Sequence, residues 1–214
     1  MIPSIIVCVS AVACLLVAEW ADSAIAKAAA KMSAATAFLA MALACGALES
    51  SFGLTLFSGL VLCWIGDACL LSRGQSAGFL IGIGAFLFGH VAYAIAFYQL
   101  GLDPIGLMLG GMIVAVLAAI LFRWLVPRVP DDFRIPVMSY LGVISLMVVT
   151  SIGAVAAGAP VILFVGAVVF AISDIFVARE RFVRTGFVNS AVGLPAYFGA
   201  QLLLAYSAGV GLAS

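Results

Sequence analysis

Two acidic residues stand inside long apolar stretches of this sequence. Asp67 follows SGLVLCWIG, and Asp174 follows FVGAVVFAIS. Burial in an apolar bundle disfavours the charged form of a carboxyl group, and two acids near one another resist double ionisation further. One acid can then keep its proton while the other is ionised, as general acid–base catalysis requires. The same pair would also suit a proton-coupled carrier.

Further polar residues accompany the two acids and extend the candidate site. Three of them, Lys31, Tyr140 and Asn189, are expected near the same ends of the predicted helices as the acids. Taken alone, Lys31 would be interpreted as a snorkelling anchor and Tyr140 as an interfacial aromatic residue, and their convergence with the two acids favours a shared site. Ser173 directly precedes Asp174. The candidate binding residues are Lys31, His90, Tyr93, Tyr140, Ser173 and Asn189.

His90 and Tyr93 are expected deeper in the membrane, within GAFLFGHVAY. We interpret them as part of the wall of a deep cavity, although a histidine that only packs helices is an equal alternative. Gln201 is interpreted as a polar contact between helices. The single His and five Cys residues, which form no CxxC pair, argue against a zinc site, and no cofactor is indicated. The sequence has no phosphate-binding loop motif and no net positive charge, so nothing in it points to nucleotides or nucleic acid as ligands.

The elements that must position these residues are membrane-spanning helices. Of the 214 residues, 66% are hydrophobic and 8% are charged, whereas a soluble domain has about a quarter charged residues. A span needs about 20 apolar residues, so the chain predicts one polytopic membrane domain over 1–214, an all-α bundle of eight transmembrane helices. The predicted spans are 3–19, 30–48, 53–71, 77–99, 104–124, 136–157, 160–178 and 187–210.

Charge placement supports the eight-span count. All basic residues lie in or beside the connections after the first, third, fifth and seventh spans, and none lies in the other connections. The positive-inside rule therefore predicts that these four connections are cytoplasmic and that both termini are outside. Asp67 lies six residues before Arg73 and Asp174 five before Arg179, which predicts a depth of roughly 7–9 Å inside the cytoplasmic boundary at about 1.5 Å per residue.

Two of the spans resemble each other at an offset of 107 residues, half the chain length. Six of the twelve residues in 56–67 are identical to their counterparts in 163–174, with Asp67 matching Asp174. Chance identity between apolar helices is one explanation of this match. A duplication is the other, and it would be a parallel four-plus-four duplication because both spans run in the same direction. Such a duplication would place the two acids at one depth, facing each other across a pseudo-two-fold axis.

The sequence as a whole resembles the YhhN family of lysoplasmalogenases. The matching elements run in order along nearly the whole chain, and Met32 stands where the family often has Pro. They are Lys31, SGLVLCWIGDACLL (58–71), GIGAFLFGHVAY (82–93), IPVMSYLGVISLM (135–147), FVGAVVFAISDIFVARERF (164–182) and LPAYFGAQLLLAYS (194–207). The acids of the family's GD and SD motifs are considered catalytic, and they correspond to Asp67 and Asp174.

The resemblance implies a hydrolase that cleaves the vinyl-ether bond of a lysoplasmalogen to a fatty aldehyde and glycerophospho-ethanolamine or -choline. The expected partners are a lysophospholipid and the bilayer, and the expected location is the bacterial inner membrane, with several passes. Two alternatives are a proton-coupled transporter of a small amphiphile and a hydrolase of another lysolipid. The sequence does not indicate the oligomeric state, the headgroup or which acid donates the proton.

Overall fold

The computed structural model describes residues 1–71 and 77–212 and contains eight long α-helices with no strand in that part of the chain. All eight helices are long and apolar enough to cross a membrane, so the all-α, eight-span prediction is confirmed. Two short 3₁₀ helices, Val126–Arg128 and Ser207–Leu212, follow the fifth and eighth α-helices. The α-helices are α1 (Ile2–Trp20), α2 (Ala24–Ala44), α3 (Ser51–Cys69), α4 (Ala77–Gln99), α5 (Pro104–Leu125), α6 (Asp131–Ala156), α7 (Val161–Phe182) and α8 (Phe187–Tyr206).

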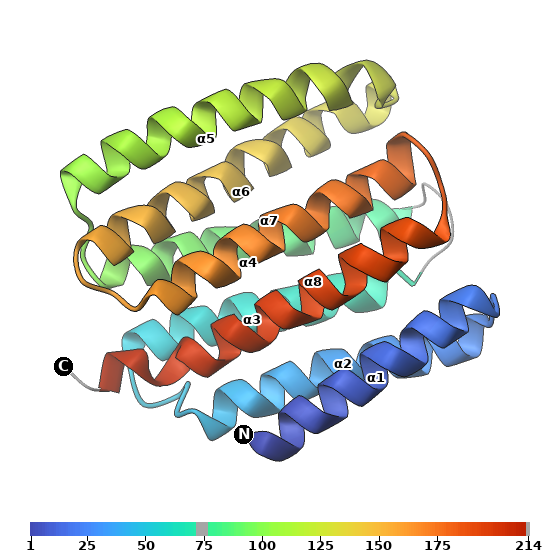
Figure 1. The fold of residues 1–214 in the computed structure, drawn as a ribbon, viewed down its shortest axis with the longest axis horizontal. Helices are drawn as coiled ribbons and strands as arrows, with labels where there is room; N and C mark the ends of the chain where they lie inside the picture. Colours follow the sequence, from blue (N-terminus) through green and yellow to red (C-terminus); the bar gives the residue numbers. More distant parts are fainter. Residues whose placement is uncertain (72–76, 213–214) are drawn as a thin grey trace.

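The eight helices lie side by side along the long axis of the molecule (Figure 1). The connections after α1, α5 and α7 lie at the right-hand end of the view, where α3 also ends and α4 begins. The connections after α2, α4 and α6 lie at the opposite end. The basic residues of the described chain fall near the first of these ends, and Arg73 lies outside the described residues. The basic residues of the described chain are therefore confined to one end of the bundle.

Two helix starts differ from the sequence prediction. The second helix begins at Ala24 rather than at residue 30, because the chain turns within three residues after Trp20 and the alanine-rich segment that follows favours helix. Lys31 therefore lies two turns inside α2 instead of opening it. The sixth helix begins at Asp131, so Pro136 lies inside α6 rather than at its start. The other helix ends agree with the prediction to within about four residues, as expected for sequence-based boundaries.

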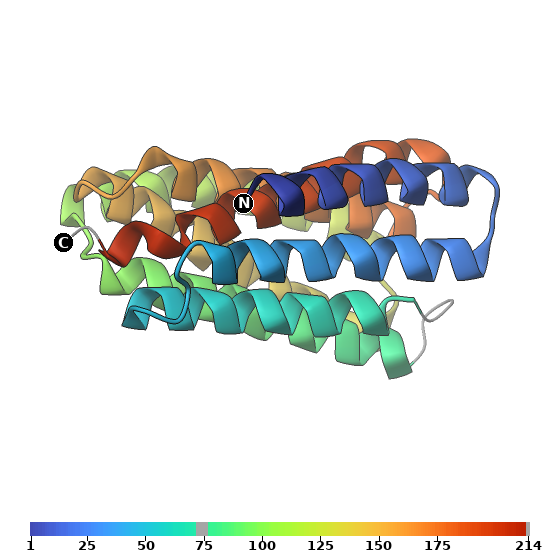
Figure 2. The same cartoon turned by 90° about the horizontal axis from the view of Figure 1, so that it is seen from below.

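Helix contacts repeat between the two halves of the chain. In the first half α1 packs on α2, α2 on α3, and α3 on α4; in the second half α5 packs on α6, α6 on α7, and α7 on α8. The contacts between the halves are reciprocal as well, because α2 packs on α8 while α6 packs on α4. Viewed from below, α3 and α4 lie on one side of the bundle and α7 and α8 on the other (Figure 2). The repeat is partial, because α1 and α3 also pack on α8 without equally extensive counterparts between α5 and α4 or α7 and α4. The four-plus-four duplication therefore stays a prediction.

Glycines allow α3 and α4 to approach closely beside the candidate site. A Cβ on Gly59 would lie 2.5 Å from the Tyr93 ring and 3.0 Å from the Gly89 carbonyl oxygen. A Cβ on Gly89 would lie 2.9 Å from Cys63 Sγ. Small residues at such positions are the usual basis of close helix packing in membranes. They set Tyr93, on α4, directly against α3.

Candidate active site

Asp67 is buried near the end of α3 and is paired with a cation. Its side chain is 1% exposed, and Lys31 Nζ from α2 lies 3.1 Å from Oδ1, an ion pair rather than a well-directed hydrogen bond. The Tyr197 hydroxyl, from α8, donates a hydrogen bond of 2.6 Å to Oδ2. A positive charge and a hydroxyl donor both favour the charged form of a carboxyl group. Asp67 is therefore arranged as a carboxylate.

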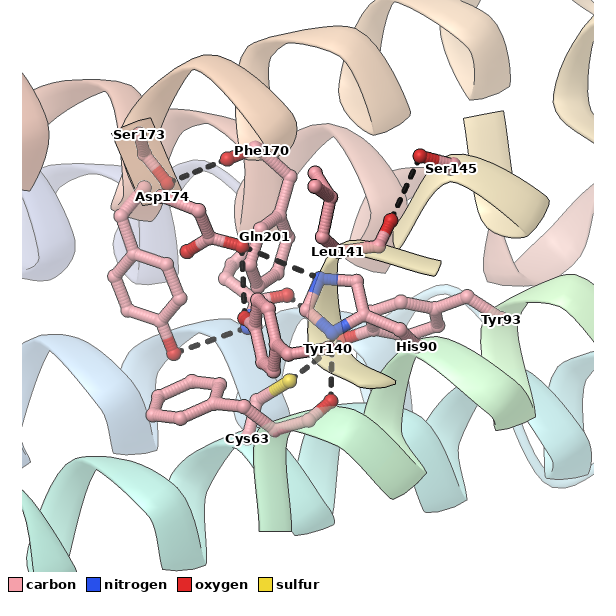
Figure 3. Close-up of polar contacts among 12 residues, drawn as sticks. Cys63, His90, Tyr93, Tyr140, Leu141, Ser145, Phe170, Ser173, Asp174 and Gln201 are labelled. Atoms are coloured by element: carbon pink, nitrogen blue, oxygen red, sulfur yellow. Dashed lines mark hydrogen bonds and ion pairs between the residues drawn. The ribbon is translucent and has the colours of Figure 1, made fainter. Parts of the chain in front are cut away.

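Asp174 has different partners and is 18% exposed. The Tyr140 hydroxyl, from α6, donates a hydrogen bond of 2.7 Å to Oδ2, and His90 Nε2 on α4 lies 3.6 Å from the same oxygen (Figure 3). Within the described residues, no Lys or Arg lies at ion-pair distance from this carboxyl. The two acids thus occupy unlike environments, as a division of acid and base roles requires.

A chain of side-chain hydrogen bonds leads from Asp67 toward the second acid. Gln201 Nε2 donates to the Tyr197 hydroxyl at 3.0 Å, and the Tyr93 hydroxyl donates to Gln201 Oε1 at 2.8 Å. The His90 ring then packs edge-on near Tyr93, with centroids 6.3 Å apart. Within residues 1–71 and 77–212 no hydrogen bond or ion pair joins the two carboxyls directly, so their connection runs through these side chains.

Aromatic rings enclose the polar groups. Phe170 lies between the His90 and Tyr197 rings, with centroid distances of 4.5 Å and 5.3 Å. The Tyr140 ring covers another side of His90, at 5.1 Å. Because such surroundings exclude water, charges and hydrogen bonds inside them act more strongly than at a surface.

Lys31, His90, Tyr93 and Tyr140 are thus gathered around the two acids, as the sequence predicts for a shared site. Two other predicted site residues, Ser173 and Asn189, do not direct their side chains to the two acids. The Ser173 hydroxyl donates to the Phe170 carbonyl oxygen, and no dashed line joins it to the carboxyl of Asp174 (Figure 3). Asn189 belongs to a separate network at the α7–α8 connection, where its side chain bonds Arg179 and Glu180.

Sequence reasoning did not place Tyr197 and Gln201 in the site. Both lie on the buried face of α8, four residues apart, so they share one side of the helix. A sequence signal for Tyr197 exists, because the offset of 107 residues that matches Asp67 with Asp174 also matches His90 with Tyr197. Each of these two residues contacts the acid of the other half. Within the described chain, no three His, Cys, Asp or Glu side chains gather closely enough to hold a metal ion.

Comparisons with known proteins find curated relatives of this chain. Lysoplasmalogenase TMEM86A from Bos taurus is 30% identical over 159 residues, which cover 72% of this chain and 64% of the relative. The human protein of that name is 31% identical, again over 72% of this chain and 64% of the relative. A lysoplasmalogenase from Mycobacterium bovis is 32% identical over 70% of this chain and 58% of its own length.

The chain thus spans less than two thirds of the length of these curated relatives. No solved structure matches it. The sequence model of the YhhN family matches residues 26–208, which include both acids, Lys31, His90, Tyr140 and Tyr197. This integral, multi-pass membrane protein belongs to the YhhN family.

Proposed function

We propose that this protein is a membrane hydrolase that cleaves the vinyl-ether bond of a lysoplasmalogen, releasing a fatty aldehyde and a glycerophospho-ethanolamine or -choline. The observation that carries the proposal is the pair of membrane-embedded carboxyls in unlike settings. Asp67 is ion-paired with Lys31, whereas the polar partners of Asp174 among the described residues are Tyr140 and His90. The relatives from cattle, humans and Mycobacterium bovis are named lysoplasmalogenases, which supports the same substrate class.

The chemistry of a vinyl ether suits two such acids. Protonation of the β-carbon by a carboxylic acid converts the double bond to an oxocarbenium ion. A carboxylate nearby stabilises this cation and accepts a proton from the water that adds to it. The resulting hemiacetal transfers its hydroxyl proton to the ether oxygen as the carbon–oxygen bond breaks, giving aldehyde and alcohol. Proton gain and loss balance over the cycle, so no cofactor is needed.

The substrate's phosphate is proposed to bind toward the basic end of the bundle. Lys31 is 13% exposed on its side chain and lies beside Asp67, and Asn189 lies with Arg179 where α7 meets α8. A lysophospholipid with its headgroup at this end would extend its tail toward the apolar interior of the bundle. We propose the bacterial inner membrane as the location.

The test is release of fatty aldehyde from lysoplasmalogen by the purified protein in detergent. Asp67→Asn and Asp174→Asn should each lower kcat by at least about 100-fold, since positioned acids and bases contribute about 10²–10⁴-fold. Asp132→Asn, a change of the same kind at an exposed position, should retain wild-type activity. Wild-type rates in both site variants would refute the mechanism.

A panel of lysolipids analysed by mass spectrometry separates this function from its alternatives. Release of aldehyde from lysoplasmalogen alone supports vinyl-ether cleavage, whereas release of a fatty acid from an acyl lysolipid indicates another hydrolase. Accumulation of unmodified substrate in sealed vesicles, abolished by an uncoupler, would indicate a proton-coupled transporter.

A further inference from the structure

His90 is held in one orientation by its surroundings. It is the single histidine of the chain, its side chain is 1% exposed, and its ring meets Phe170, Tyr140 and Tyr93. Its Nδ1 lies 2.6 Å from the carbonyl oxygen of Phe86, one turn earlier on α4. A carbonyl oxygen can only accept, so Nδ1 must carry a hydrogen atom and donate it.

This donation determines what the other ring nitrogen offers. In a neutral imidazole with its hydrogen on Nδ1, Nε2 presents a lone pair. Nε2 is buried, has no hydrogen-bond partner within residues 1–71 and 77–212, and faces Asp174 Oδ2 at 3.6 Å. If Asp174 were ionised, its carboxylate oxygen and the Nε2 lone pair would face each other as two acceptors without a hydrogen atom between them. Such an arrangement is costly in a buried site. A proton on one of the two groups removes this unfavourable contact.

The partners of the two acids indicate which acid carries a proton. Asp67 has the Lys31 ammonium group and the Tyr197 hydroxyl, both of which stabilise a carboxylate. Asp174 has one hydroxyl donor, Tyr140, and faces His90 Nε2, an imidazole nitrogen that carries no hydrogen atom. A protonated Oδ2 of Asp174 can accept from Tyr140 while its hydrogen atom faces His90 Nε2, and a small closure of the 3.6 Å separation would complete a hydrogen bond. The carboxylic acid form of Asp174 thus satisfies both neighbours.

We propose that Asp174 is the general acid of the reaction and that His90 is the positioning residue that keeps its proton in place. This assignment rests on the proposed function. Asp174 transfers its proton to the β-carbon of the vinyl ether and becomes a carboxylate. Asp67 accepts a proton from the attacking water, and return of that proton to Asp174 through solvent restores the starting state.

Nuclear magnetic resonance of ¹⁵N-histidine-labelled full-length protein in detergent tests the pair directly, because one histidine gives one pair of ring-nitrogen signals. At neutral pH we expect a protonated Nδ1 and an unprotonated Nε2 that accepts a hydrogen bond. Asp174→Asn should shift the Nε2 signal, whereas Asp132→Asn should leave it in place. A hydrogen atom on Nε2 in the wild type, or no shift in Asp174→Asn, would overturn the proposal.

His90→Gln gives a kinetic test, because an amide N–H would replace the nitrogen lone pair and favour the Asp174 carboxylate. We expect kcat to fall at least about tenfold at neutral pH and the alkaline limb of the pH–rate profile to move to lower pH. The other titratable groups facing His90 are Tyr93 on its own helix and Tyr140 on α6, with Cys63 beyond Tyr93. An unchanged profile contradicts the role of His90.

The two experiments separate failure of this pair from failure of the proposed function. If the wild-type protein released no aldehyde from lysoplasmalogen, the proposed function would fail, and the nitrogen signals would still report whether the proton is shared. If aldehyde is released but Asp174→Asn leaves the signals in place, the function stands and the pairing is wrong.

Discussion

At the scale of single residues, Tyr197 links Asp67 to Gln201. Its hydroxyl donates to Asp67 Oδ2 at 2.6 Å and accepts from Gln201 at 3.0 Å. A hydrogen bond to a charged group contributes about 1.5–3 kcal/mol, and about 1.4 kcal/mol is a tenfold change in rate. If Asp67 stabilises the cation in the transition state, loss of this hydrogen bond leaves the Asp67 carboxylate less firmly oriented toward that cation.

Tyr197→Phe is therefore expected to lower kcat for aldehyde release by about tenfold while keeping the ring contacts with Phe86 and Phe170. Steady-state kinetics and a melting curve in detergent measure the two effects separately. Tyr98→Phe on α4 is the control, because Tyr98 is 69% exposed. Equal kcat values for Tyr197→Phe and the wild type would show that the hydroxyl does not assist Asp67.

Lys31 and Lys27 lie one turn apart on α2 and provide a matched pair for the ion-pair contribution. Lys31 pairs with the buried Asp67, whereas Lys27 pairs with Glu19 and the exposed Asp22. Removing one partner of a buried ion pair costs about 3–5 kcal/mol, and an exposed pair contributes about 0–1 kcal/mol. Lys31→Met should thus lower the midpoint of unfolding in detergent clearly more than Lys27→Met.

A double variant distinguishes loss of the ion pair from simple loss of packing. In Lys31→Met with Asp67→Asn, no buried charge is left without a partner, so part of the lost stability should return. If the double variant is less stable than Lys31→Met alone, the ion pair is not the source of the effect.

Residue identity alone was enough to find the two acids, because an Asp within an apolar span is costly. It was not enough to find Tyr197 and Gln201, since Tyr and Gln occur in membrane helices for many reasons, including packing and helix contacts. Only the three-dimensional structure shows that their hydroxyl and amide groups reach Asp67 and Tyr93. Ser173 shows the converse, because its place beside Asp174 in sequence does not bring its hydroxyl to the carboxyl.

At the scale of helices, hydropathy and basic residues were sufficient to predict eight spans but not the start of α2 or α6. The segment 24–29 contains Lys27 among alanines, so its hydropathy falls although its helix propensity stays high. Pro136 suggested a helix start, yet Asp131 to Arg134 complete a turn before it. Hydropathy reports what the bilayer covers, and a helix can extend beyond that region.

The close approach of α3 and α4 gives a prediction at this scale. Gly89→Ala would place a Cβ 2.9 Å from Cys63 Sγ and 3.2 Å from the Gly59 carbonyl oxygen, so the helices must separate slightly. Overpacking of this kind costs about 1–3 kcal/mol. Gly84→Ala on the same helix meets no atom within 4 Å and serves as the control.

Melting curves in detergent should show a lower midpoint for Gly89→Ala than for Gly84→Ala. Activity should fall as well, because Gly89 directly precedes His90 and a shift of α4 moves the imidazole relative to Asp174. Equal midpoints for the two variants would show that the α3–α4 contact accommodates the extra Cβ at position 89 without loss of stability.

At the scale of the whole molecule, each acid takes one partner from its own half of the chain and one from the other half. Asp67 contacts Lys31 within the first half and Tyr197 from the second; Asp174 contacts Tyr140 within the second half and His90 from the first. The site is therefore built where the halves meet, and neither half holds a complete acid environment. A duplicated ancestor with two equal sites would acquire distinct acid and base roles through differences such as Tyr197 opposite His90.

The orientation of the bundle in the membrane gives the last prediction. The positive-inside rule places the α7–α8 connection, which holds Arg184, in the cytoplasm and the α6–α7 connection outside. Thr185 and Ala157 are exposed positions in these connections. When the protein is produced in a bacterium, Ala157→Cys should react with a membrane-impermeant maleimide in cells whose outer membrane alone is opened. Thr185→Cys should react only after the inner membrane is also permeabilised. The wild-type chain, with its five native cysteines, sets the background. The reverse pattern would place the basic end, and with it Asp67 and Lys31, on the outer side, so the lysolipid would have to reach the acids from the other leaflet.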